Sequence, residues 1–230
     1  MTSHRIVSHD EWIEASKALL AKEKEFTRMR EEMAKLRRAL PWELVEKDYV
    51  FDSTDGKVTL AGLFGGKSQL IVQHLMFGPD WNEGCPACSF WADNFNGVDA
   101  HLAARDTAFV AVSRGPLDKL MAYRKRMGWT FRWVSSLGSD FNFDYGVSLR
   151  EGDRYNYGTM DAKGEMPGVS AFRREDGRTY HTYSTYARGL DLLNGAYHLL
   201  DITSKGRDEG SLGFPMAWVR RHDKIGRAHV

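Results

Sequence analysis

The two cysteines of the chain, Cys85 and Cys88, are separated only by a proline and an alanine, in the stretch NEGCPACSFW. If Cys85 is the N-cap of a helix, Pro86 takes the first helical position, where its missing N–H costs nothing. The helix N-terminus then favours the thiolate of Cys85, and Cys88 lies one turn further along on the same face, within disulfide reach. This spacing predicts a nucleophilic Cys85 and a resolving Cys88.

Two other interpretations of the cysteine pair stay open, a metal site and a pair of unreactive thiols. A structural zinc site needs four ligands, and the nearby His74 and His101 are not at zinc-finger spacing. His74 falls in an apolar run and is expected to be a core histidine. No metal and no cofactor are therefore expected. Serine-nucleophile, phosphate-loop and dinucleotide-binding motifs are also absent from the sequence.

The residues around the pair could tune its reactivity. Glu83 stands two positions before Cys85 and is expected to oppose thiolate formation. Further along the chain, the polar and aromatic stretch HTYSTYARG contains His181, Tyr183 and Arg188. We expect these three side chains either to face a substrate or to pack in the ordinary way.

The elements around the cysteines alternate between strands and helices. An apolar run from Leu70 to Phe77 predicts a buried strand, the next segment to Ala104 has helical spacing, and TAFVAVS predicts a second buried strand. Strand, helix and strand in this order predict a parallel crossover. A hairpin is expected around Asp176-Gly177, and GLDLLNGAYHLLD predicts a closing helix. Residues 138–166 are expected to form a long loop, with or without a short helix.

The first forty residues predict a long amphipathic helix, opened by the capping box Ser8-x-x-Glu11 and closed before Pro41. Its apolar residues recur at close to heptad spacing: Trp12, Leu19, Phe26, Met33, Leu36 and Leu40. Such a helix packs across its own domain, pairs with the same helix in a homodimer, or forms a free-standing coiled coil.

Composition restricts the partners and the domain organisation. The 230 residues are 42% hydrophobic, carry a formal net charge of +1, and contain no apolar run near the roughly 20 residues of a membrane span. Nucleic-acid and membrane partners are therefore not expected. The start lacks a secretory signal pattern, which favours a cytoplasmic protein. We predict a helical arm (1–41), a core domain (42–200), a C-terminal extension (201–224) and a non-native tail (225–230), because IGRAHV resembles a translated sequencing adapter.

These motifs resemble the thioredoxin superfamily. CPAC at the start of a helix is one half of the resemblance, and MPGVSAFRREDG resembles the superfamily's cis-proline element, which implies that Pro167 lies beside the cysteines in a cis peptide bond. More closely, FGPDWNEGCPACSFWAD, YRKRMGW, SDFNFDYGVS, HTYSTYARGLDLLNGAYHLLD and MAWVRRHD are similar to a bacterial family, domain of unknown function 899. That resemblance implies an α/β thioredoxin-like fold, with a long N-terminal helix and a C-terminal extension, and a dithiol–disulfide role.

Two positions differ from better-known branches of the superfamily. Thioredoxins place a tryptophan directly before the first cysteine, whereas Trp81 is four residues upstream here. The peroxiredoxin pattern Thr-x-x-Cys is missing, because Asn82 stands at the threonine position. The resemblance therefore implies disulfide exchange more than peroxide reduction.

Together these observations predict a thiol–disulfide oxidoreductase that acts on a protein or small-molecule disulfide. The competing hypothesis is a binding protein on the same scaffold, whose aromatic segment from Trp129 to Tyr157 holds a small molecule or peptide while the cysteines are incidental.

Overall fold

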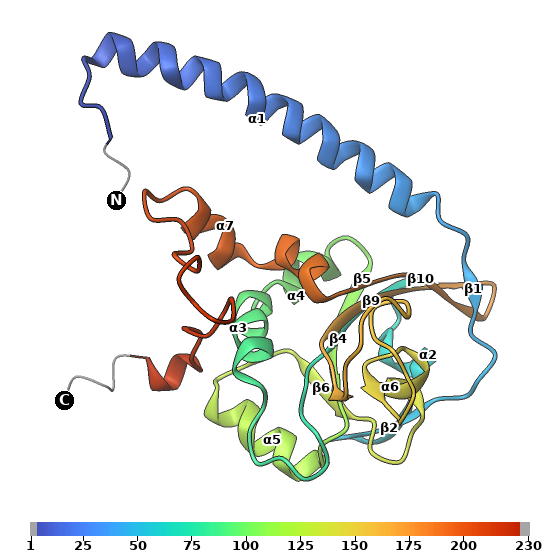
Figure 1. Cartoon of the computed structure of the whole chain (residues 1–230). Helices are drawn as coiled ribbons and strands as arrows, with labels where there is room; N and C mark the ends of the chain where they lie inside the picture. Colours follow the sequence, from blue (N-terminus) through green and yellow to red (C-terminus); the bar gives the residue numbers. More distant parts are fainter. Residues whose placement is uncertain (1–3, 226–230) are drawn as a thin grey trace. The chain divides into compact units, whose positions relative to one another are not determined.

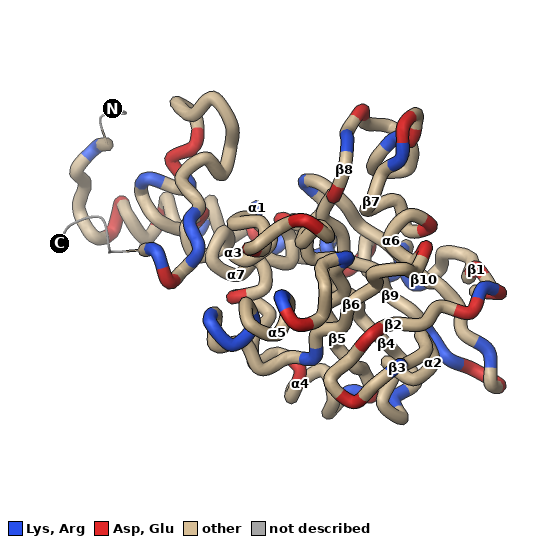
Figure 2. The backbone as a smooth tube through the Cα atoms, turned by 90° about the horizontal axis from the view of Figure 1, so that it is seen from below, with Lys and Arg blue, Asp and Glu red and all other residues tan. Residues whose placement is uncertain are grey.

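The computed structural model describes residues 4–225 (Figure 1). The chain divides after Pro41 into two compact units, 1–41 and 42–230, which are described separately. The predicted non-native tail, apart from Ile225, lies outside the described residues. Within the described range, no helix is both long and apolar enough to cross a membrane. Short segments of Lys and Arg and short segments of Asp and Glu are scattered along the backbone (Figure 2), in keeping with the near-neutral composition.

The first unit consists mainly of one helix, and the second contains a mixed sheet with its helices. In chain order the elements are α1 (His9–Arg38), β1 (Glu43–Leu44), β2 (Val50–Ser53), β3 (Gly56–Thr59), α2 (Leu60–Leu63), β4 (Gln69–His74), α3 (Pro86–Phe95), α4 (Asp99–Ala103), β5 (Thr107–Ser113), α5 (Leu117–Arg126), β6 (Arg132–Ser135), α6 (Phe141–Asp144), β7 (Ser148–Leu149), β8 (Gly164–Glu165), β9 (Gly168–Glu175), β10 (Arg178–Tyr186), η1 (Ala187–Leu193), α7 (Gly195–Asp201) and η2 (His222–Lys224).

Eight strands form one sheet in the order β1-β10-β9-β4-β5-β6-β2-β3. Strand β4 is central: it runs parallel to β5, with Val72 opposite Val110, and antiparallel to β9. The chain passes from β4 through α3 to β5, so the predicted parallel crossover is confirmed. The predicted α/β fold with a central mixed sheet is confirmed as well. Strands β7 and β8 form a separate small ladder.

The alternation of side chains along β4 separates two hydrophobic cores. Leu70 and Val72 point to one face, where α2 and α6 pack. Leu75 lies in the other core with Cys88 of α3 and Tyr123 of α5. Figure 1 shows the same arrangement, with α3 and α5 on one side of the sheet and α2 and α6 on the other. The cysteines therefore belong to one face of the sheet only.

Three predicted elements differ in detail from those observed. The helix expected up to Ala104 is interrupted after Phe95, where Gly97 has a φ of +89°, and resumes as α4. Residues 138–166 contain a short helix, α6, which the prediction allowed, and also the strands β7 and β8, which it did not include. The closing helix is split into η1 and α7, because the Asn194 side chain accepts a hydrogen bond from the Tyr197 N–H and starts a new helix.

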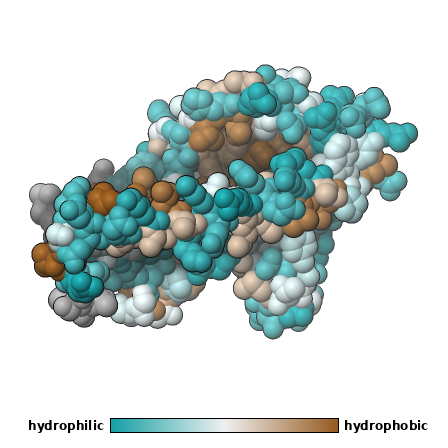
Figure 3. Space-filling view, turned by 90° about the horizontal axis from the view of Figure 1, so that it is seen from above, coloured by the Kyte–Doolittle hydropathy of each residue, from teal (hydrophilic) through white to brown (hydrophobic). Residues whose placement is uncertain are grey.

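Helix α1 begins at the predicted capping box: the Glu11 N–H donates to Ser8 Oγ, and the Ser8 N–H donates to Glu11 Oε2. None of its residues is buried. Its apolar row stays exposed within this unit, and Figure 3 shows apolar side chains, in brown, at the surface among hydrophilic ones. The row consists of Trp12, Leu19, Phe26 and Met33, with Leu36 beside it.

We predict that this apolar row pairs with its copy in a homodimer, because the heptad spacing is that of a two-stranded seam. A variant that begins at Leu40 should have the mass of a monomer in multi-angle light scattering, whereas the full chain should have that of a dimer. Phe26→Glu should have the same effect, whereas Lys24→Glu, on another face of α1, should leave the mass unchanged. A full-length chain that is already monomeric would contradict the prediction.

The cysteine pair as a candidate active site

Cys85 occupies the N-cap of α3, with Pro86 as the first helical residue, as the spacing predicted. Its backbone is extended (φ −54°, ψ 133°), and its N–H donates to the Met76 carbonyl over 3.0 Å, which ties the loop to the strand end. Its carbonyl accepts from both the N–H and the hydroxyl of Ser89. These two hydrogen bonds close the first turn of α3, directly after its N-cap, Cys85.

Cys88 lies one turn deeper and is buried, whereas Cys85 is half-buried. Its sulfur accepts a hydrogen bond from the Met76 N–H at 3.5 Å, and its carbonyl accepts from Gln73 Nε2 at 3.3 Å. Both cysteines are free thiols. The pair is therefore in its reduced form, with Cys85 partly accessible and Cys88 enclosed.

The surroundings of the two thiols shift their pKa values in opposite directions. The pKa of Cys85 is lowered to about 6, chiefly by a hydrogen bond from the Cys88 side chain, with further help from the backbone N–H groups of Cys88 and Ala87 and from the charge of Arg221. Burial acts in the opposite direction. The pKa of Cys88 is raised well above its usual value by the same hydrogen bond, by burial, and by the charge on Cys85. At neutral pH the thiolate resides on Cys85.

The cation beside Cys85 comes from the C-terminal extension. The Arg221 guanidinium donates to the Gly84 carbonyl at 2.7 Å from Nη2 and at 3.1 Å from Nε, and Nε also approaches the Tyr123 hydroxyl at 3.1 Å. Tyr123 in turn shares a hydrogen bond of 2.9 Å with Ser89 Oγ. Arg221 is thus fixed to the residue that precedes the nucleophile and to the first turn of α3.

Glu83 is compensated by two arginines, which changes the role expected of it. Its carboxylate accepts a short hydrogen bond from Arg126 Nη1 and forms an ion pair of 2.9 Å with Arg221 Nη1. The bond from Arg126 is also the main cause of the lowered pKa of Glu83. Glu83 therefore holds Arg221 in place, and its negative charge is largely balanced before it can act on Cys85.

We predict that Arg221→Met raises the pKa of Cys85, because a nearby opposite charge is lost. If that pKa moves from about 6 to about 7, alkylation by iodoacetamide at pH 6 slows about fivefold. Arg221→Lys should restore part of the rate. The matched control is Arg220→Met, since the Arg220 side chain is exposed and bonds carbonyls of its own segment. Equal rates in Arg221→Met and the native chain would exclude this role.

Strand pairing places Pro167 near the end of β4 that leads to the cysteine site. The predicted cis peptide bond before Pro167, however, is wrong. No peptide bond in residues 4–225 is cis. The trans form is the intrinsically favoured one, and here the Met166 N–H donates to the Val147 carbonyl, which extends the β7–β8 ladder up to the proline. Because His74 pairs with Gly168, the antiparallel register carries Pro167 and Met166 towards the end of β4 that holds Cys85.

A buried tyrosine links Pro167 to the end of β10. The Tyr155 hydroxyl donates to the Pro167 carbonyl and accepts from the Ala187 N–H. Burial raises the pKa of Tyr155, and the charge of Cys88, when ionised, raises it further, so the phenol stays protonated as a donor. Trp81 has a different position: it lies half-exposed in the preceding loop, where its carbonyl accepts from Lys119 Nζ.

The three residues expected from HTYSTYARG do not come together at the cysteines. His181 lies in β10 and contacts the rings of Tyr145 and Phe172, which belong to the core on the opposite face of the sheet. Tyr183 follows a bulge in the same strand. Arg188 is exposed in η1 and forms an ion pair with Asp191. His74 is a buried core histidine, as expected, with its Nε2 bonded to Ser170 Oγ.

Comparison with known proteins places this architecture in a family. The model of a family described as bacterial proteins of unknown function (DUF899) matches residues 1–225. The chain belongs to this family. No curated protein matches it. Within this DUF899 chain, the cysteine pair, Arg221 and the sheet that supports them all fall inside the matched range.

The solved structures that resemble this chain have low sequence identity to it. A cysteine-to-serine mutant of Xanthomonas campestris peroxiredoxin Q superposes with a TM-score of 0.50 at 14% identity, covering 70% of this chain and 97% of that one. A peroxidoxin, BcpB, from Mycobacterium tuberculosis gives 0.48 at 14% identity, covering 72% and 99%. The first supports the thioredoxin-like fold of the DUF899 chain.

Proposed function

We propose that this DUF899 protein is a thiol–disulfide oxidoreductase that uses Cys85 and Cys88. The observation that carries the proposal is the asymmetry of the pair: the half-buried Cys85 has its pKa lowered to about 6, and the buried Cys88 has its pKa raised. A thiolate that is available at neutral pH beside a protonated partner is what stepwise disulfide exchange requires.

In the first step, the Cys85 thiolate attacks one sulfur of a substrate disulfide. A Cys85–substrate bond forms, the substrate S–S bond breaks, and the departing sulfur leaves as a thiolate that takes a proton from water. In the second step, Cys88 loses its proton to solvent and attacks Cys85 Sγ, the Cys85–substrate bond breaks, and the other substrate sulfur leaves as a thiolate that takes up a proton. The substrate gains two electrons, and the pair becomes a disulfide.

The geometry also gives a reason for the order of the steps. The charge of Cys85 and the hydrogen bond to its thiolate are two of the causes that keep Cys88 protonated. Once Cys85 is part of a mixed disulfide, its charge is gone. Burial still opposes ionisation, but the Met76 N–H continues to favour a thiolate on Cys88. Resolution therefore becomes easier only after attack has occurred.

We predict that disulfides oxidise the pair faster than peroxides, although the structural neighbours include peroxiredoxins. The threonine of the peroxiredoxin pattern is replaced by Asn82, whose side-chain oxygen accepts from Lys119 Nζ at 3.2 Å. Loss of free thiols should be followed after mixing the reduced protein with equal concentrations of glutathione disulfide, hydrogen peroxide or a small alkyl hydroperoxide. Faster reaction with either peroxide would favour a peroxidase instead, and Cys85→Ser supplies the blank for each oxidant.

A further inference from the structure

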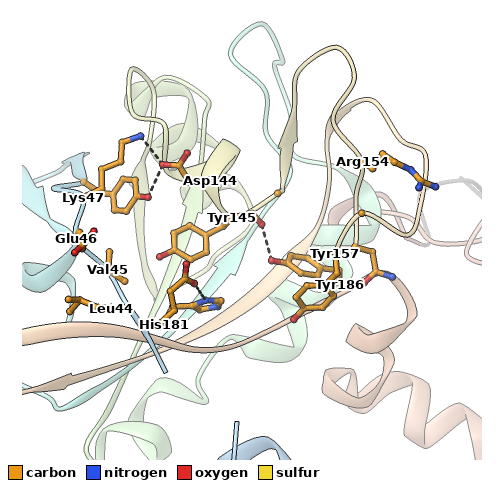
Figure 4. A pocket seen from close by; sticks show the side chains of 15 residues that line it. Leu44, Val45, Glu46, Lys47, Asp144, Tyr145, Arg154, Tyr157, His181 and Tyr186 are labelled. Carbon is orange, nitrogen blue, oxygen red and sulfur yellow. Dashed lines mark hydrogen bonds and ion pairs between the residues drawn. The ribbon is translucent and has the colours of Figure 1, made fainter. Parts of the chain in front are cut away.

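A pocket with a volume of about 430 Å³ lies on the face of the sheet opposite the cysteines. Three segments surround it: residues 43–49, residues 144–158 and strand β10. Figure 4 shows side chains from these segments directed towards a common space. All of them belong to the unit 42–230, and the chemistry proposed for the cysteines uses none of them.

The lining of the pocket is rich in tyrosine, with Tyr49, Tyr145, Tyr157 and Tyr186 all contributing. The rings of Tyr157 and Tyr186 meet edge to face at 5.2 Å, and Tyr145 meets His181 in the same way at 5.2 Å. These two pairs appear apart from one another in Figure 4. Aromatic faces on more than one side of a pocket offer negative π surfaces to a cation placed between them.

One tyrosine hydroxyl in the pocket lacks a protein partner. The hydroxyls of Tyr49, Tyr157 and Tyr186 each donate to a protein oxygen, at 2.7, 2.6 and 2.9 Å respectively. The Tyr145 side chain is only 9% exposed, yet among residues 4–225 its hydroxyl has no hydrogen bond. The hydroxyl oxygen is not fully enclosed, so it faces the solvent-filled space of the pocket. This hydroxyl is therefore available to a molecule in the pocket.

The charges around the pocket favour a cationic occupant. The carboxylates of Glu43, Glu46 and Asp144 line it, against the cations Lys47 and Arg154. Both cations are already engaged by carboxylates of the protein. Lys47 Nζ lies 2.8 Å from both Asp140 and Asp144, and Arg154 Nε lies 2.9 Å from Asp161. Neither side chain is free to neutralise an anionic ligand.

A series of hydrogen bonds holds His181, which lines the pocket, in place. His181 Nδ1 lies 3.1 Å from Glu43 Oε2, and its Nε2 lies 2.7 Å from Ser184 Oγ. From Ser184 the series continues through Ser170 to the buried His74. Burial lowers the pKa of His74 to about 3, so His74 adds no positive charge behind His181.

We propose that this pocket binds a small organic cation, specifically a quaternary or methylated ammonium group. The tyrosine faces hold the alkyl groups. Glu43 and Glu46, which lie in the lining with no lysine or arginine of the described part of the chain paired to them, provide the negative potential. The Tyr145 hydroxyl is placed to bond a polar substituent of the ligand. Because the pocket and the cysteines lie on opposite faces, binding does not depend on the thiols.

The test compares choline with its uncharged isostere, 3,3-dimethylbutan-1-ol, which has a carbon in place of the nitrogen cation. Isothermal titration calorimetry on the full chain should show that choline binds and that the isostere binds about tenfold more weakly or less. Equal binding of the two, tighter binding of the anion 3,3-dimethylbutanoate, or no choline binding at about 10 mM would each overturn the proposal.

Substitutions of residues that line the pocket test whether choline binds there. Tyr157→Ala removes a ring that is 70% exposed, and Glu43→Gln removes a charge while it keeps a group able to bond His181, so both are expected to fold. Each should weaken choline binding about 3- to 30-fold. The controls are Asp118→Asn, an exposed carboxylate of α5 on the other face, and Cys85→Ser, and both should bind as the native chain does. Native affinity in Tyr157→Ala and Glu43→Gln together would exclude this pocket.

Discussion

Replacing Cys85 by serine is expected to abolish the reduction of insulin or of a small disulfide, because a serine hydroxyl is not ionised at neutral pH and cannot attack sulfur in this way. The loss should be complete within detection, because Cys88 is buried, which limits its access to substrate and opposes its ionisation even without Cys85. Activity is measured as thiol release under a constant supply of reductant. Residual activity in Cys85→Ser close to that of the native chain would exclude Cys85 as the nucleophile.

Cys88→Ser should behave differently, because it removes only the resolving step. Cys85 still attacks, and the mixed disulfide with substrate should accumulate and be visible as an added mass by intact-protein mass spectrometry. In the native chain, iodoacetamide at pH 6 should label Cys85 rapidly and Cys88 slowly, since an ordinary cysteine is almost wholly protonated at that pH. Slow and equal labelling of both cysteines, with no trapped adduct, would favour the hypothesis of incidental thiols.

The fold around the cysteines could be predicted because local patterns agree with the tertiary arrangement. The apolar run at Leu70 and the run from Thr107 each have the length and two-sided apolarity of a buried strand, and they pair in parallel in the structure. The helix between them begins where Pro86 allows it to begin. The position of Cys85 at a helix N-terminus follows from these local rules.

The partners of that site could not be predicted, because they depend on contacts between distant segments. Arg221 lies in an irregular block without helical or strand periodicity, and 137 positions separate it from Gly84, whose carbonyl it bonds. Tyr155 and Tyr123 are similar cases, since their roles arise from hydrogen bonds across the fold. The only signal in the sequence was the run of charges around Arg221, which does not identify a partner.

His181 shows a related limit of sequence patterns. Its position in a polar and aromatic strand end suggested a functional role. The pattern does not say, however, on which face of the sheet the His181 side chain lies. A side-chain period of two fixes alternation along a strand, whereas the bulge between His181 and Tyr183 changes the register locally. The structure assigns His181 to the pocket opposite the cysteines.

The hydrogen bond between the two thiols is the largest cause of the lowered pKa of Cys85. Cys88→Ala removes the donor, so the pKa of Cys85 should rise from about 6 towards its ordinary value. Cys88→Ser keeps an O–H donor, which is stronger than S–H, so the pKa should stay near 6 or fall. At pH 6, a rise of about one unit lowers the thiolate fraction from about one half to about one tenth.

Alkylation of Cys85 followed from pH 5 to pH 9 separates the two variants. The thiolate fraction grows as pH rises, so the half-maximal rate marks the pKa in each protein. At pH 6, Cys88→Ala should react about fivefold more slowly than Cys88→Ser. Near pH 9 both are mostly thiolate and should agree within about threefold, since nucleophilicity depends only weakly on pKa. If Cys88→Ala keeps a midpoint near pH 6, the helix N-terminus and Arg221 suffice without Cys88, and the resolving thiol has no part in activating the nucleophile.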